Sequence, residues 1–152
     1  MKIVIGCDEA AFDMKEAVHQ RLKELQYDVI DVGVYDKNPS LYPDTAEKLC
    51  KEIVEGRAEK GILMCGTGIG MAITANKIPG IRAAVGHDVF SVERSRKSND
   101  CQVLCMGSRV IAIQSALMLM ERWLQCEFAG GASKAKVDRI REIECQYRYC
   151  LL

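Results

Sequence analysis

The sequence predicts an α/β fold built on a single doubly wound, five-stranded parallel sheet with helices on both faces. Three observations support this prediction. Five short runs of mostly apolar residues have the length expected of buried strands. Segments with apolar residues at helical spacing lie between these runs and after the last one. No linker, repeat or low-complexity tract divides the 152 residues, so we expect one domain spanning residues 1–152.

The predicted strands and helices alternate along the chain. The first strand covers KIVIG at 2–6, which is β-branched, apolar and closed by glycine, and a helix follows it. The other strands are expected at 28–32, 60–64, 82–86 and 102–106, and the helices at 12–25, 42–55, 70–78, 89–97, 111–125 and 133–147. Neighbouring parallel strands need right-handed crossovers, which place helices over both faces of a Rossmann-like sheet.

Charge and hydropathy argue against several classes of protein. The 21 basic residues are balanced by 21 acidic ones, so no net field attracts nucleic acid or an anionic membrane. The first residues lack a secretory signal pattern, and the apolar run at 111–120 is too short to span a bilayer. We therefore expect a cytoplasmic protein with no nucleic-acid or membrane partner.

The cysteine pattern favours reduced thiols over a disulfide framework. The eight cysteines are unevenly spaced and include no CxxC pair. The two histidines, His19 and His87, have no cysteine or histidine at zinc-ligand spacing, so no metal site is expected. A thiol redox protein is the alternative that the cysteine count alone would allow.

Ligands of doubly wound sheets bind beyond the carboxyl ends of the strands, so residues that directly follow a strand are the candidates. The most informative segment is ILMCGTGIGMAITANK at 62–77, where a buried strand ends at Cys65 and three glycines open a helix. Glycines allow a tight turn that points several N–H groups at one place, and the helix N-terminus adds positive potential there. This predicts an anion-binding loop, although GTGIG matches neither of the common nucleotide-binding glycine motifs.

Two residues of this loop are candidates for chemistry. A helix N-terminus favours the thiolate of Cys65, which could serve as a nucleophile or as a base. Thr67 either caps the helix or orients a substrate.

Other residues at the same edge have two interpretations each. Asp8 either binds a sugar hydroxyl or caps the following helix. His87 either donates a proton to a ring oxygen or is a loop histidine. Arg109 follows the fifth strand and either binds a phosphate through its forked donors or is a surface arginine. Lys134 and Lys136, at the start of the last helix, could hold phosphate or be solvated.

The last helix has a charged, amphipathic KAKVDRIREIE pattern. It either packs on its own domain or reaches a partner subunit.

Three segments of the sequence resemble the ribose-5-phosphate isomerase type B family, which also contains galactose-6-phosphate isomerase subunits. They are GCD near the N-terminus, CGTGIGMAITANKIPGIRAA in the middle and SNDCQVLCMGSRVIA later, and the likeness runs almost end to end. The resemblance implies an aldose–ketose isomerase of sugar phosphates that works through an enediolate and needs no metal or organic cofactor. It also implies a homodimer or homotetramer with active sites shared between subunits, which favours a last helix that reaches the partner.

The resemblance also assigns roles to particular residues. Cys65 is the base that moves a proton between C1 and C2, and Asp8 and Asn99 hold substrate hydroxyls. The backbone amides of the loop stabilise the enediolate oxygen; they belong to Gly66, Thr67, Gly68, Ile69, Gly70 and Met71.

This sequence departs from the family pattern at the positions that bind phosphate and open the ring. Glu9 and Ser98 replace two histidines, and Ala132 and Lys136 replace two arginines. Lys136 is therefore expected to bind the phosphate, with help from Arg109 and Lys134.

The sequence is compatible with two classes of sugar-phosphate substrate. A tetrose 4-phosphate needs no ring opening, and the HDxxSxER pattern followed by SN, at 87–99, resembles a branch linked with four-carbon sugar phosphates. Alternatively, His87 opens the ring of a pentose or hexose phosphate. A non-catalytic sugar-phosphate sensor is the alternative function.

Overall fold

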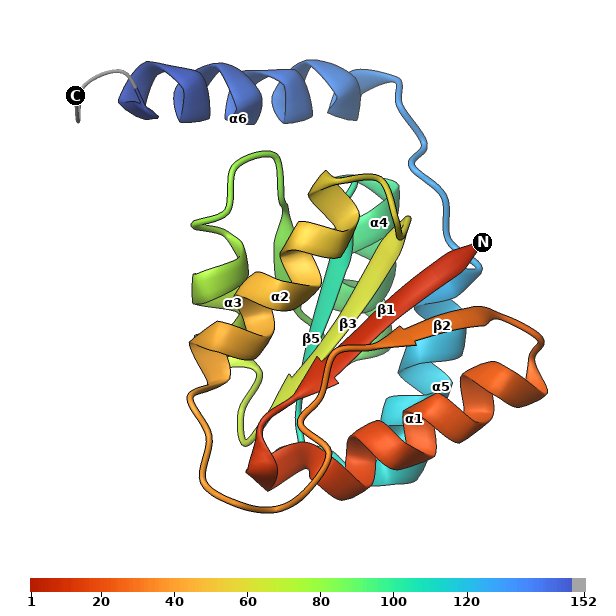
Figure 1. Ribbon diagram of the computed structural model, residues 1–152. Helices are drawn as coiled ribbons and strands as arrows, with labels where there is room; N and C mark the ends of the chain where they lie inside the picture. The colour runs from red at the N-terminus through yellow and green to blue at the C-terminus, as the bar shows by residue number, and fades with distance from the viewer. Residues whose placement is uncertain (149–152) are drawn as a thin grey trace.

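The computed structural model describes residues 1–148 as a five-stranded sheet with helices on both faces (Figure 1). The strands are β1 (Lys2–Cys7), β2 (Asp28–Asp31), β3 (Lys60–Cys65), β4 (Ala83–Val85) and β5 (Val103–Gly107). Their order is β2-β1-β3-β5-β4, and every neighbouring pair is parallel. The predicted fold class is therefore confirmed.

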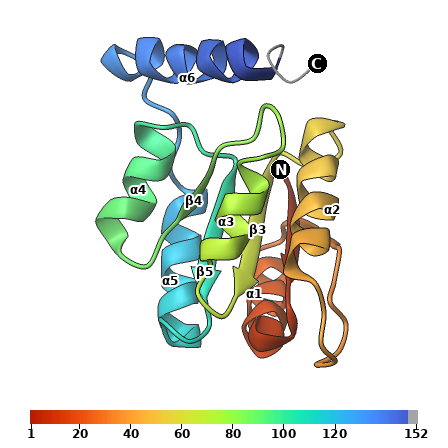
Figure 2. The same ribbon diagram turned by 90° about the vertical axis from the view of Figure 1, so that its left-hand side faces the viewer.

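The helices form two layers and one outlying element. Helices α1 (Phe12–Glu24), α4 (Val89–Lys97) and α5 (Ile113–Leu124) cover one face, and α2 (Tyr42–Val54) and α3 (Ile69–Ala75) cover the other. A short 3-10 helix, η1 (Glu9–Ala11), joins β1 to α1. Helix α6 (Ala132–Arg148) lies outside both layers, across the ends of the strands opposite their arrowheads (Figures 1 and 2).

The central strand explains why the sequence shows apolar runs rather than alternation. Every residue of β3 is buried, because helices cover both of its sides. Ile62 and Met64 pack into the layer of α1 and α5, whereas Leu63 and Cys65 pack into the layer of α2 and α3. The side chain of Cys65 therefore faces the α2 and α3 side of the sheet.

Most predicted boundaries differ from the observed ones by one or two residues. The largest difference is the helix expected at 70–78, which is Ile69–Ala75 in the structure. It ends early because the amide of Asn76 bonds both the N–H and the C=O of Ala83, each at 2.9 Å. The η1 turn was not predicted.

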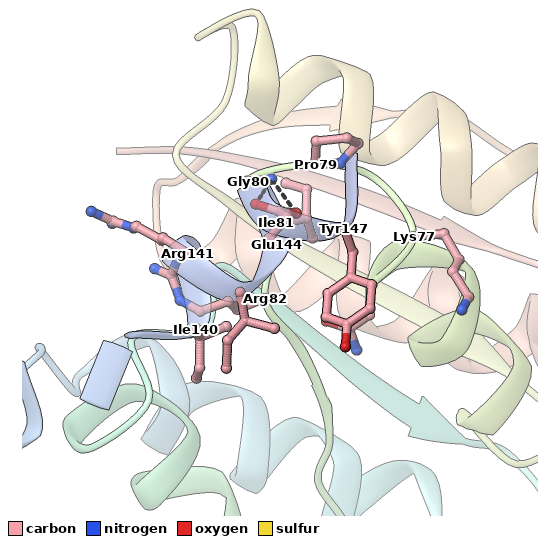
Figure 3. A pocket seen from close by; sticks show the side chains of 11 residues that line it. Lys77, Pro79, Gly80, Ile81, Arg82, Ile140, Arg141, Glu144 and Tyr147 are labelled. Atoms are coloured by element: carbon pink, nitrogen blue, oxygen red, sulfur yellow. Dashed lines mark hydrogen bonds between the residues drawn. The ribbon is translucent and has the colours of Figure 1, made fainter. Parts of the chain in front are cut away.

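Helix α6 contacts its own chain beside the loop that precedes β4 (Figure 3). The Gly80 N–H donates to both carboxylate oxygens of Glu144, at 3.0 and 3.1 Å. Ile140 and Tyr147 line a groove of about 500 Å³ between the helix and this loop. None of the helices in residues 1–148 is long and apolar enough to cross a membrane.

Candidate functional site

Residues that follow three neighbouring strands meet at the carboxyl edge of the sheet. The register pairs Cys7 with Met64 and Cys65 with Gly107, so β1, β3 and β5 end at the same level. The chain after these strands brings Asp8, the 65–70 loop and Arg109 to one place, as the sequence predicted.

Cys65 is only 5% exposed, and its sulfur accepts a backbone hydrogen bond from its own loop. The Gly68 N–H donates to Cys65 Sγ at 3.1 Å. Gly68 has φ +77°, and a Cβ there would lie 3.1 Å from the backbone of Met106, so only glycine fits. This backbone donor holds the sulfur in one position at the start of the loop.

Backbone contacts fix the loop to the end of β5. The Ser108 N–H donates to the carbonyl of Cys65 at 2.9 Å, and the Arg109 N–H donates to that of Gly66 at 3.0 Å. A Cβ on Gly107 would lie 2.7 Å from the backbone of Thr67. The position of Cys65 is therefore set by β5 as well as by its own strand.

The remaining loop residues contribute in different ways. Thr67 Oγ1 accepts the Ile69 N–H at 3.3 Å, next to Gly68, which is the N-cap residue of α3. The side chain of Met71 is buried in the core, which leaves only its backbone near the loop. Tyr42, which sequence analysis missed, packs its ring on Gly70, where a Cβ would lie 2.5 Å from Tyr42 Cζ. Only the position of Tyr42 at the start of a predicted helix was visible in the sequence.

Two carboxylates accompany Arg109 at this edge. Asp8 Oδ1 accepts the N–H groups of Ala10 and Ala11 at 3.0 and 3.2 Å, which is the capping role. Burial raises the pKa of Asp8 above its ordinary value, and the nearby Glu9 adds to this, although Arg109 opposes it.

Glu9 bonds the loop that leads into α2. Its carboxylate accepts the N–H and the hydroxyl of Ser40, at 3.1 and 2.7 Å. The hydrogen bond from the Ser40 hydroxyl is the main reason that the pKa of Glu9 lies below its ordinary value.

The Arg109 side chain is exposed and passes 3.5 Å from the position that a Cβ on Gly66 would take, so its guanidinium lies over the loop.

The His87 ring is hydrogen-bonded to the backbone at the carboxyl edge of the sheet, with Nε2 as the acceptor. His87 Nε2 accepts the Gly107 N–H at 2.8 Å, so the ring proton of the neutral imidazole is on Nδ1. Burial lowers the pKa of His87 below its ordinary value, and the Asp88 carboxylate partly opposes this. If His87 donates a proton, Nδ1 is the atom that carries it.

Asn99 and Lys136 lie away from Cys65 within one chain. Asn99 precedes β5, whose five residues place it on the order of 13 Å or more from Gly107. Its amide donates to the carbonyl of Arg94 at 2.9 Å, beside a cavity of about 400 Å³. Lys136 is exposed on α6, which lies across the amino ends of the strands (Figure 1). The predicted substrate-binding residues are thus divided between the two edges of the sheet.

Two other groups of ionisable residues are relevant to a metal site or a redox centre: one cluster of possible metal ligands, and the cysteines. In residues 1–148, Glu16, His19 and Asp31 have ligand atoms within 4.8 Å of one another. The ammonium of Lys15 already binds Asp31 at 2.7 Å and Glu16 at 3.0 Å, which supplies the positive charge that a cation would bring. The seven cysteines of this part of the chain are free thiols, and Cys150 lies outside it.

Comparison with known proteins shows similarity over almost the whole chain. A family model described as Ribose/Galactose Isomerase matches residues 3–140. A Ribose-5-P isomerase B from Listeria innocua is 49% identical over 97% of this chain and 100% of its own length. A D-erythrulose-4-phosphate isomerase from Pectobacterium atrosepticum is 45% identical over 98% of this chain and 99% of its own length. The solved structure of Clostridium thermocellum Ribose-5-Phosphate Isomerase B has a TM-score of 0.95 at 40% identity, covering 97% of this chain and 99% of that one.

Proposed function

The chain belongs to the ribose/galactose isomerase family, and we propose that the Cys65 thiolate transfers the proton between C1 and C2 of its sugar-phosphate substrate. The protein is an aldose–ketose isomerase, like the relatives named for that activity. The observation that carries the proposal is the Gly68 N–H directed at Cys65 Sγ, in a loop that is fixed to β5 and covered by Arg109.

The proposed reaction needs one base and a set of hydrogen-bond donors. The thiolate removes the proton from C2 of the open-chain aldose, the C2–H electron pair forms the C1–C2 double bond, and the carbonyl electrons move to O1. The resulting thiol returns the proton to C1, while the O2 proton is lost and O1 gains one, which gives the ketose. First-turn N–H groups of a helix have no partner within it, and the Ile69 N–H already donates to Thr67, so those of Gly70 and Met71 are the donors proposed for the enediolate oxygen. Such donors typically contribute about 3 kcal/mol each to transition-state stabilisation in acyl transfer.

The substrate contacts are proposed to come from two copies of the chain. In support, Cys65 and Arg109 lie at the carboxyl edge, whereas Asn99 and Lys136 lie at the amino edge, too far away to meet one ligand within one chain. Helix α6 also exposes Ile140 and Ile143 by 46% and 42%, which gives it an apolar surface for a partner.

Mixing two inactive variants tests this sharing of sites. Cys65→Ala and Lys136→Glu proteins, each nearly inactive alone, should regain roughly a quarter of wild-type activity when unfolded and refolded together, because each mixed dimer holds one intact site. Sedimentation and dilution assays provide the control. A fully active monomer, or no recovery from mixed refolding, would refute the shared site.

We propose a four-carbon sugar phosphate as the substrate. A tetrose 4-phosphate cannot close a furanose through its phosphorylated oxygen and needs no ring-opening acid. Ser98, at the position where the family has its ring-opening histidine, accepts a hydrogen bond from Arg94 Nη1 at 3.3 Å and has no group that titrates near neutral pH. His87 lies at the other edge with Nε2 bonded to Gly107. A five- or six-carbon substrate opened by His87 is the second candidate.

An isomerisation assay with erythrose 4-phosphate, ribose 5-phosphate, allose 6-phosphate and galactose 6-phosphate tests the substrate and the base together. Cys65→Ala should lower turnover of the best substrate by about two to four orders of magnitude. Cys50→Ala is the matched control, since this thiol is buried in the same core layer and burial raises its pKa to about 12. Full turnover by Cys65→Ala would exclude Cys65 as the base.

Solvent exchange separates the isomerase from a sugar-phosphate sensor. An isomerase incorporates solvent deuterium at C1 or C2 of its substrate, whereas a protein that only binds the sugar does not. Binding of a sugar phosphate without exchange on any of the four would favour the sensor.

A further inference from the structure

The contact between His87 and Gly107 links the edge strand to the segment on which the Cys65 loop rests. Strand β4 has only three residues, and the Gly86 N–H that follows it donates to Cys105 at 3.0 Å. After Gly86 the next hydrogen bond between this segment and β5 involves a side chain: His87 Nε2 accepts the Gly107 N–H at 2.8 Å.

The peptide that His87 binds is in direct contact with the loop. A Cβ on Gly68 would lie 3.1 Å from both N and C of Met106, and one on Gly107 would lie 2.7 Å from Thr67. These two backbones are so close that a shift of one moves the other. The Gly68 N–H that points at Cys65 Sγ belongs to this contact.

The hydrogen bond requires one protonation state of the ring. The Gly107 amide is a donor, so Nε2 must be the unprotonated, accepting nitrogen. Partial burial of the ring favours this neutral form, and the charged group beside it is Asp88, on the same loop.

We propose that His87 is a positioning residue of the isomerase reaction, which holds the Gly107 peptide and thereby the Gly68 N–H against Cys65 Sγ. This inference rests on the proposed role of Cys65 as the base. It differs from the ring-opening role considered above, because positioning requires a lone pair on the side chain and no transferable proton.

Two substitutions separate a hydrogen-bond acceptor from a proton donor. In glutamine, Oε1 lies four bonds from Cα, as Nε2 does in histidine, and it accepts a hydrogen bond but supplies no acid near neutral pH. His87→Gln should therefore keep most of the wild-type kcat. His87→Ala leaves the Gly107 N–H without an acceptor and should lower kcat by about ten- to a hundredfold, since small misplacements of reacting groups are costly. The KM should change less than kcat, because the phosphate contacts are not altered.

Kinetics with erythrose 4-phosphate and ribose 5-phosphate test the proposal, with thermal unfolding as the control for folding. Loss of activity in His87→Gln as severe as in His87→Ala would overturn it. Loss in His87→Gln with ribose 5-phosphate alone would overturn the claim that His87 needs no transferable proton and would identify it as the ring-opening acid for that sugar.

Amide hydrogen exchange measured by NMR supplies a readout that is independent of activity. The Gly107 and Gly68 amides should exchange faster in His87→Ala than in wild type and stay protected in His87→Gln. Unchanged protection in His87→Ala would refute the positioning role. If the wild type isomerised none of the four sugar phosphates while the exchange rates followed this pattern, the proposed function would fail and the structural role of His87 would stand.

Discussion

The Gly107→Ala substitution is expected to slow catalysis by moving the Cys65 loop. The added Cβ would lie 2.7 Å from the backbone of Thr67, whereas ordinary contacts begin at 3.4 Å. One backbone would therefore have to move by about 0.7 Å, the difference between these two distances. A shift of about 1 Å at reacting groups can cost about a hundredfold in rate, so we expect kcat to fall by about ten- to a hundredfold. Overpacking should also lower the free energy of unfolding by about 1–3 kcal/mol.

The matched control is Gly61→Ala, at the amino end of β3. Its Cβ would lie 2.6 Å from Leu49 Cδ2, which is the end of a flexible side chain rather than backbone. This variant should lose a similar amount of stability, measured by urea unfolding, but retain kcat in the isomerisation assay. If Gly107→Ala kept the wild-type kcat, or if both variants lost kcat equally, the claim that β5 sets the position of the loop would be wrong.

Two further predictions concern ionisable groups. The pKa of His87 in the folded protein lies below its ordinary 6.5, so the unfolded chain binds more protons as pH falls below 6.5 and stability decreases there. The pH profile of kcat should fall in the same acidic range in the wild type, and a His87→Gln variant with the same profile would contradict this. Lys15→Met removes the fully buried partner of Asp31 and should lower the free energy of unfolding by about 3 kcal/mol, whereas an unchanged urea midpoint would show that the pair is not stabilising.

The elements of the fold were predictable because each depends on residues close together in the chain. The run at 60–64 is apolar throughout, as a strand covered on both faces must be, and the structure places it at the centre of the sheet. The helix expected at 89–97 has the same bounds in the structure. Prediction was least accurate at 70–78, where the end of the helix depends on a bond from Asn76 to Ala83 in the next strand.

The loop at Cys65 was also recognisable locally. Three glycines after a buried strand indicate a turn with N–H groups directed at one place, and the structure has Gly68 in a left-handed conformation with its N–H on Cys65 Sγ. The two interpretations of Asp8 and Thr67 could not be separated in advance, because capping and ligand binding use the same oxygen atoms.

The sequence by itself determined the parallel sheet, its helices and the loop that presents Cys65, since periodicity and glycine spacing are properties of short segments. Only the tertiary structure decided what surrounds that loop. The strand order puts β5 between β3 and β4, and this is why His87, twenty residues from Gly107 in the chain, becomes its hydrogen-bond acceptor. The same order leaves Asn99 at the opposite edge from Cys65. Contacts between distant segments depend on strand order and register, and neither is encoded in the local pattern of any one segment.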